Sequence, residues 1–101
     1  MKHPNKWIIL KTPECYKVFA TWIGSYTEGE SWQINSGVSL VKEDDHFYYF
    51  HGYSGSLYKC YKKNYGVATS YGNKVLADIL KKAKGQVVAL EDRDDWSTLL
   101  E

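Results

Sequence analysis

The chain has 101 residues, of which 44% are hydrophobic and 25% charged, and these are the proportions of an ordinary globular protein. Its length suits one domain, so we expect residues 1–101 to fold as a unit. Thirteen basic and 12 acidic residues leave a formal charge of +1, which excludes a strongly basic nucleic-acid coat. The uncharged runs are shorter than the about 20 residues of a membrane-spanning helix, so we expect no membrane segment.

The N-terminal segment and the cysteines indicate the compartment. Residues Met1–Leu10 contain no small-residue cleavage site, so we expect no secretory signal. Cys15 and Cys60 lie far apart and outside any disulfide-rich pattern, which favours two reduced thiols and a cytoplasmic location. Neither cysteine forms a CxxC pair, so we expect no zinc site, and we also expect no other metal and no cofactor.

Two strands are predicted at the start of the chain, after a loose N-terminus over residues 1–5. The apolar run Trp7–Lys11 is typical of a short strand, and Pro13 interrupts the chain after it. Residues Cys15–Ile23 alternate with period 2. This alternation predicts a second strand, whose core side carries Tyr16, Val18, Ala20 and Trp22.

One long strand is predicted between two turns. Glycine and polar residues over Gly24–Glu30 are typical of a turn. Residues Ser31–Lys42 keep one alternation throughout, and its apolar members are Trp32, Ile34, Val38 and Leu40. Gly37 fits either a bulge in one long strand or a tight turn between two short strands. Because the alternation is unbroken across it, we favour the single strand with a bulge, followed by a charged turn at Glu43–Asp45.

A hairpin is predicted over the next residues. The segments His46–Tyr53 and Ser56–Lys63 are rich in strand formers and flank the dipeptide Ser54-Gly55. Serine and glycine at that point are typical of a hairpin tip. The residues 64–71 that follow are expected to connect the hairpin to the next element.

One helix is predicted over about residues 73–84. Apolar residues cover one helical face there, namely Val75, Leu76, Ile79, Leu80 and Ala83. Asn73 is the expected N-cap, and Gly85 is placed to end the helix. Beyond it, Gln86–Leu90 predicts a final strand.

The last residues, 91–101, are expected to form an acidic turn and a short tail. Four of the five residues in Glu91–Asp95 are acidic. The segment Trp96–Leu100 has the composition of one further helical turn, which an aspartate before it would cap.

The order of these elements predicts an α+β fold. Consecutive strands joined by short turns pair antiparallel, which gives one antiparallel sheet of about five or six strands. The helix is expected to pack on one face of this sheet. The other face is expected to meet water or a partner.

The aromatic content indicates a binding surface. Nine Tyr and four Trp are more than one small core is expected to hide, so several should lie on the surface. We therefore expect a small non-enzymatic binding protein that acts through a protein–protein interface, such as a phage or mobile-element inhibitor of a larger enzyme. A homodimer would use the same exposed rings. The candidate residues are Trp32, Tyr49, Tyr53, Tyr61, Asp92, Asp94 and Asp95, the aspartates as mimics of nucleic-acid phosphates.

A first alternative is nucleic-acid binding. Residues 59–84 contain seven lysines and one acidic residue. Lys59, Tyr61 and Lys63 share one side of their strand, where rings stack on bases and ammonium groups neutralise phosphates. Lysines at the end of the helix would extend this surface, namely Lys81, Lys82 and Lys84.

A second alternative is a small-ligand binder or enzyme at the 51–56 hairpin, using His51 and Ser54. The segment lacks the GxSxG pattern of a nucleophile elbow, because Ser56 stands where the second glycine belongs. His46 and His51 fall on opposite sides of a strand, so they do not predict a shared metal. We therefore expect no catalytic residues there and rank this hypothesis last.

Overall fold

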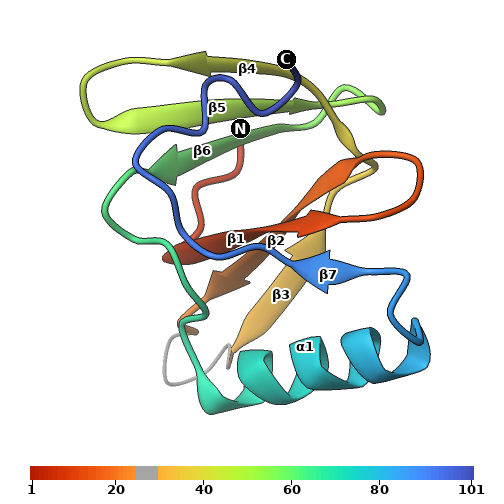
Figure 1. The fold of residues 1–101 in the computed structure, drawn as a ribbon. Coiled ribbons are helices and arrows are strands. Elements are labelled where there is room, and N and C mark those ends of the chain that lie inside the picture. Colours follow the sequence, from red (N-terminus) through yellow and green to blue (C-terminus); the bar gives the residue numbers. More distant parts are fainter. Residues whose placement is uncertain (25–29) are drawn as a thin grey trace.

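Three layers of secondary structure make up the fold in the computed structural model, which describes residues 1–24 and 30–101. A three-stranded sheet, a four-stranded sheet and one helix lie on one another in that order (Figure 1). The predicted α+β class is confirmed, with seven strands in two antiparallel sheets rather than five or six in one. The turn predicted over residues 24–30 lies mostly outside the described residues.

The four-stranded sheet forms the middle layer. It contains β1 (Lys6–Lys11), β2 (Tyr16–Trp22), β3 (Ser31–Ile34) and β7 (Val88–Ala89), in the order β3-β2-β1-β7. Both of its faces are covered, which explains the unbroken apolar run in β1. Trp7 and Ile9 point into the space between the sheets, whereas Ile8 and Leu10 point toward the helix. The expectation that one sheet face meets water or a partner is therefore wrong for this sheet.

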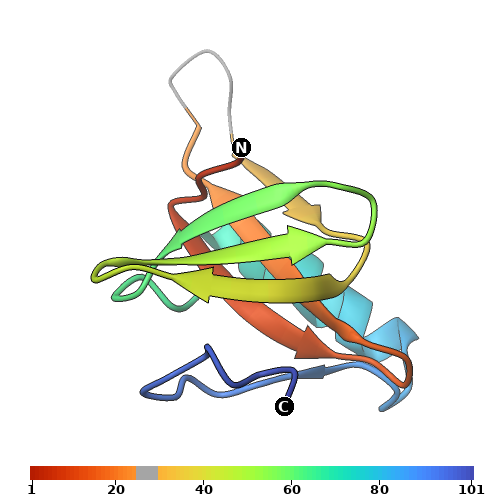
Figure 2. The same cartoon turned by 90° about the horizontal axis from the view of Figure 1, so that it is seen from above.

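The three-stranded sheet forms the layer farthest from the helix. Its strands are β4 (Val38–Glu43), β5 (Phe47–Gly52) and β6 (Leu57–Tyr61), in the order β4-β5-β6. The predicted hairpin is β5–β6, and Gly55 at its tip has φ +90°. Figure 2 looks down on this sheet and shows that none of the other described helices and strands covers its far side.

The single long strand expected over residues 31–42 is wrong, and the structure has the alternative, two short strands with a turn between them. The chain leaves one sheet after β3 and enters the other at β4. Asn35 ends the first ladder, because its backbone N–H donates to Val18 O and its Oδ1 accepts from Val18 N. Gly37 then turns the chain at φ +135°, a conformation that favours glycine. The register shift of β4 falls between Val38 and Leu40 instead.

The helix α1 (Ser70–Lys82) covers the other face of the four-stranded sheet. It begins earlier than predicted, because Thr69 and not Asn73 is the N-cap. The Thr69 hydroxyl accepts a hydrogen bond from the backbone N–H of Gly72 at 2.8 Å. The first turn has no apolar periodicity, which hid the start of the helix from sequence analysis. Gly85 adopts φ +86° just after the helix, at the predicted position.

The two chain ends are fixed against the sheets. Residues 1–5 were expected to be loose, but Lys2 pairs with Tyr58 in β6 and Pro4 is buried. At the other end, Trp96 is 1% exposed and fills the core between the sheets. The segment after Trp96 forms turns rather than the predicted helical turn. Among the described residues, no helix is long and apolar enough to cross a membrane.

Candidate binding face

The far side of the three-stranded sheet is the candidate site, and we call it the outer face. Alternation decides which side chains lie on it, because every second residue of β5 and β6 points into the core. The buried set includes Tyr48, Phe50, Tyr58 and Cys60. The outer face consists of the residues between them and their neighbours on β4, namely Leu40, Lys42, Phe47, Tyr49, His51, Leu57, Lys59 and Tyr61.

Strand register arranges the outer face in three rows. An aromatic row, with Phe47 opposite Tyr61, lies next to the β4–β5 turn. A lysine row crosses the middle of the sheet, with Lys42 and Lys59 on either side of Tyr49. An apolar row lies toward the hairpin tip and contains Leu40, His51 and Leu57.

The aromatic rings of the outer face pack against one another. The Phe47 ring centroid lies 5.4 Å from that of Tyr61 and 6.4 Å from that of Tyr49, in tilted arrangements. The Lys59 ammonium lies 4.3 Å from the Phe47 centroid, in a cation–π contact. The His3 ring meets Phe47 edge-on at 5.3 Å. These contacts hold the rings in place, so the surface is formed before any partner binds.

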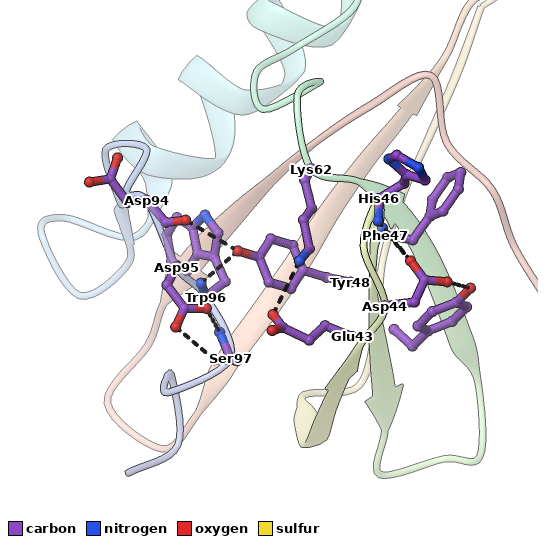
Figure 3. A network of polar contacts seen from close by, with 11 residues as sticks. Glu43, Asp44, His46, Phe47, Tyr48, Lys62, Asp94, Asp95, Trp96 and Ser97 are labelled. Atoms are coloured by element: carbon purple, nitrogen blue, oxygen red, sulfur yellow. Dashed lines mark hydrogen bonds and ion pairs between the residues drawn. The ribbon is translucent and has the colours of Figure 1, made fainter.

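A carboxylate marks the turn end of the outer face. Asp44 accepts a hydrogen bond from the Tyr49 hydroxyl at 2.7 Å and two more from the backbone N–H groups of His46 and Phe47 (Figure 3). The Tyr49 hydrogen bond and then the backbone bonds lower the pKa of Asp44 to about 2. The same hydrogen bond raises the pKa of Tyr49. Asp44 is therefore charged at neutral pH.

Ion pairing separates the lysines near this sheet. The Lys62 ammonium lies 3.4 Å from the Glu43 carboxylate and 4.9 Å from the Tyr48 ring centroid. Glu43 therefore balances the charge of Lys62, which lies near the C-terminal residues Asp95 and Ser97 (Figure 3). Within residues 1–24 and 30–101, no carboxylate lies within ion-pair distance of Lys42 or Lys59. Among the described residues, Lys42 and Lys59 thus give the outer face a positive charge that no ion pair balances.

The aromatic residues predicted for a protein interface fall in different places. Tyr49 and Tyr61 lie together on the outer face. Tyr53 lies just past β5 in the hairpin loop and is 66% exposed. Trp32 is on the helix side of the four-stranded sheet, half-buried and stacked on Phe19 at 5.8 Å. The structure therefore brings two of these four rings together and leaves Trp32 in a core.

The three predicted aspartates lie in the C-terminal segment, away from the outer face. Asp92 accepts hydrogen bonds from the Trp96 indole N–H and the Arg93 backbone N–H. Asp95 accepts two from Ser97, which lower the pKa of its carboxyl. The side chain of Asp94 points away from this network (Figure 3). Two of the three carboxylates thus hold the segment in shape.

The residues predicted for nucleic-acid binding are divided between two sides of the molecule. Lys59 and Tyr61 lie on the outer face, and Lys63 is exposed in the turn after β6. The lysines at the end of α1 and just after it lie on the opposite side, beyond the four-stranded sheet (Figure 1), and they are Lys81, Lys82 and Lys84. These residues do not form one continuous basic surface.

The 51–56 hairpin has structural contacts that account for Ser54. The Ser54 backbone N–H donates to Ser36 Oγ at 2.9 Å, and the two hydroxyls lie 3.1 Å apart. This pair joins the hairpin loop to the chain between β3 and β4. His51 lies on the outer face instead, in the apolar row. Within the described part of the chain, no group of three or more His, Cys, Asp and Glu is placed to hold a metal ion.

Four members of the site were not among the residues predicted from sequence, namely Leu40, Lys42, Phe47 and Leu57. Phe47 shares the alternation of Tyr49, so it belongs to the same side of the strand by a signal present in the sequence. Leu40 and Lys42 required the register between β4 and β5, which no local pattern specifies.

Comparison with known proteins adds no family to this description. No protein-family model, no curated protein and no solved structure matches the chain.

Proposed function

We propose that this chain is a small non-enzymatic binding protein and that its outer face contacts a protein partner. One observation carries the proposal. The side chains of Phe47, Tyr49 and Tyr61 cluster on the one sheet face, among those described, that no other layer covers. Aromatic side chains are enriched at the centres of protein interfaces, where they supply most of the binding energy.

The distribution of rings over the molecule supports this choice of surface. Trp7 and Trp96 fill the core between the sheets, and Tyr48 and Tyr58 are buried there with them. The fold therefore hides many of the rings that composition alone predicted for the surface. The partly exposed rings of Phe47, Tyr49 and Tyr61 lie close together on the outer face. Leu40, on the neighbouring strand, is 44% exposed.

The charges of the outer face favour a protein over a polyanion. Lys42 and Lys59 are two positive charges, and Asp44 and Asp45 place two negative charges at the turn end. Nucleic-acid binding requires a surplus of positive charge on the protein, which neutralises the phosphates of the nucleic-acid backbone. A protein interface, by contrast, combines apolar groups with charges of both signs at its rim.

The thiols and the size of the chain support the remaining parts of the proposal. Cys15 and Cys60 are free, and a chain with unpaired thiols suits a reducing compartment, so we propose a cytoplasmic location. A chain of 101 residues that functions through one interface would act by covering a surface of its partner. Inhibition of a larger enzyme, as by phage or mobile-element proteins, is the form of this activity that we propose.

A variant with a matched control tests the outer face. Tyr49→Ser with Tyr61→Ser removes two rings from it, whereas Tyr71→Ser removes a ring that is 48% exposed on α1. Tagged proteins are expressed in cells of the source organism, captured, and compared by quantitative mass spectrometry. We expect one discrete protein whose recovery falls by about 10-fold or more in the double variant only, as for loss of hot-spot residues.

The same variants separate a nucleic-acid partner from a protein partner. Binding of a fluorescent 20-nucleotide single strand is measured at several salt concentrations. Tight binding that falls steeply with salt and is lost in the double variant would replace the protein proposal with a nucleic-acid function. Circular dichroism and thermal melting of each variant confirm that it is folded before its binding is interpreted.

A further inference from the structure

We propose that the partner contributes an extended segment that pairs with the free edge of β4 and so extends the three-stranded sheet. The inference rests on the proposed function, because it assumes that the outer face contacts a protein. It adds the mode of binding and the chemistry of the bound segment. Binding by an added strand obtains affinity from main-chain hydrogen bonds and specificity from alternate side chains.

The free edge of β4 is the longest unpaired strand edge that the structure describes. At the other end of the sheet, Lys2 closes β6 by donating to Leu57 O at 2.8 Å and accepting from the Lys59 N–H at 2.7 Å. The four-stranded sheet ends in β3 and β7, which have four and two residues. The six residues of β4 receive no backbone hydrogen bond on their free side from any described residue.

The hairpin geometry identifies the backbone groups on the free edge. The Asp44 N–H donates to Phe47 O at 3.0 Å, which makes this pair a hydrogen-bonded pair of the β4–β5 ladder. Such pairs alternate in an antiparallel ladder, so Lys42 and Leu40 also bond to β5. The N–H and C=O groups of Val41 and Glu43 therefore point toward the free edge.

The side chains next to this edge specify the bound segment. Lys42 and Leu40 lie on the outer face, two residues apart, where they would neighbour the first added strand. Lys42 has no ion-pair partner among the described residues, whereas Glu43 is paired with Lys62. Opposite charges and apolar pairs across neighbouring strands are favourable. The segment should therefore carry an acidic residue opposite Lys42 and an apolar residue two positions away, opposite Leu40.

Two features of β4, a lysine and a register shift, limit its pairing with other strands. A lysine and a bulge are the usual means by which edge strands avoid aggregation. The register shift between Val38 and Leu40 disturbs one end of β4 only, and pairing is regular from Leu40 to Glu43. A second copy of this chain is a poor occupant. Antiparallel pairing that sets Lys42 against Asp44 of the copy also sets Glu43 against Glu43.

The test uses a backbone change that leaves every side chain in place. The protein is synthesised in two segments joined at Cys60, with N-methylvaline at position 41. The control carries the N-methyl group at Ser70, the first residue of α1, whose N–H has no partner within the helix. The probe is a displayed library of random 12-residue peptides, selected on the unmodified protein and then measured singly.

Three results are expected if a strand is added. Enriched peptides carry an acidic residue two positions from an apolar one. Their affinity falls by about 10-fold or more when Val41 is N-methylated and is unchanged by the Ser70 control, since a donor is lost and the edge is blocked. Selection on a Lys42→Glu protein exchanges the acidic residue for a basic one.

Other results would overturn the inference. Failure to enrich any peptide, or enriched peptides that ignore both Val41 methylation and Lys42→Glu, would exclude strand addition at β4. If partner recovery depends on Tyr49 and Tyr61 but not on Val41 methylation, the outer face is a binding surface without an added strand. If the Val41 change matters and the Tyr variants do not, the proposed function is wrong and the edge alone binds. A dimer seen by sedimentation that Val41 methylation abolishes would make a second copy the occupant.

Discussion

Asp44 and Tyr49 are joined by a 2.7 Å hydrogen bond that links the acidic β4–β5 turn to the outer face. The phenol donates and the carboxylate accepts, so the bond favours the ionised form of Asp44. Two backbone N–H groups of the turn donate to the other carboxylate oxygen. A single side chain thus fixes both the turn and one ring of the candidate binding surface.

This relationship predicts an acid-dependent contribution to stability. The pKa of Asp44 is lowered from 3.8 to about 2 in the folded chain, so the unfolded chain takes up the proton first as pH falls. The contribution of Asp44 is therefore complete above about pH 4 and disappears as pH falls toward 2. Urea unfolding from pH 5 to 2 should show a smaller loss of stability in Asp44→Asn than in the native protein. Equal losses in the two proteins would contradict the assignment.

Trp96 predicts a large contribution from the C-terminal segment. Its ring is 1% exposed, stacks on Tyr65 at 5.1 Å, and lies 6.0 Å from the Trp7 ring. Its backbone N–H also donates to the Tyr48 hydroxyl at 3.0 Å. Trp96→Ala should lower the free energy of unfolding by about 3–5 kcal/mol, as for other buried aromatic residues.

Denaturant unfolding measures the Trp96 effect, and Asp94→Ala is the control. The Asp94 side chain points away from the packed residues, so its removal should change stability by less than about 0.5 kcal/mol. Similar effects of the two substitutions would mean that the segment does not pack between the sheets.

The start of α1 predicts a difference between two neighbouring polar residues. Thr69→Ala removes the hydroxyl that accepts from the Gly72 N–H and should cost about 1 kcal/mol. Asn73 lies inside the helix at an exposed position, and Asn73→Ala replaces a weak helix former by a strong one. Thermal melting should therefore show a lower Tm for Thr69→Ala only. A larger loss in Asn73→Ala would restore Asn73 as the cap.

The two thiols should differ in reactivity. Cys60 is fully buried and burial raises its pKa, because the thiolate would lose its hydration. Cys15 is partly exposed and lies just before β2. A thiol-specific chromogenic reagent should therefore modify one equivalent in the folded protein and a second only on unfolding. Rapid modification of both thiols in the native protein would contradict the burial of β6.

Sequence periodicity was sufficient to predict most helices and strands, but it did not predict that the strands divide between two sheets. The run Trp7–Lys11 and the apolar face of α1 are local signals, and both predictions are confirmed. Trp32 and Val38 share one alternation, yet Trp32 packs beneath α1 and Val38 packs between the sheets. The turn at Asn35–Gly37 changes the side of the chain that faces the core, and period 2 alone does not reveal such a change.

The candidate site was only partly predictable for the same reason. Alternation predicts that Lys59 and Tyr61 lie on the same side of their strand, and this is confirmed. The burial of Trp96 depends on Tyr48 and Tyr65, which are remote in sequence, so an acidic tail gave no sign of it. Fewer rings lie on the surface than the composition indicates, because two cores, and not one, are available to bury them.

Site-specific photocrosslinking compares the outer face with the opposite side of the molecule. Benzoylphenylalanine replaces Leu40 on the outer face or Tyr71 on α1, two positions with exposed fractions of 44% and 48%. Both proteins are expressed in cells of the source organism and irradiated. We expect a discrete protein adduct from position 40 and none from position 71. Adducts from position 71 alone, or a nucleic-acid adduct from position 40, would contradict the outer face as a protein-binding surface.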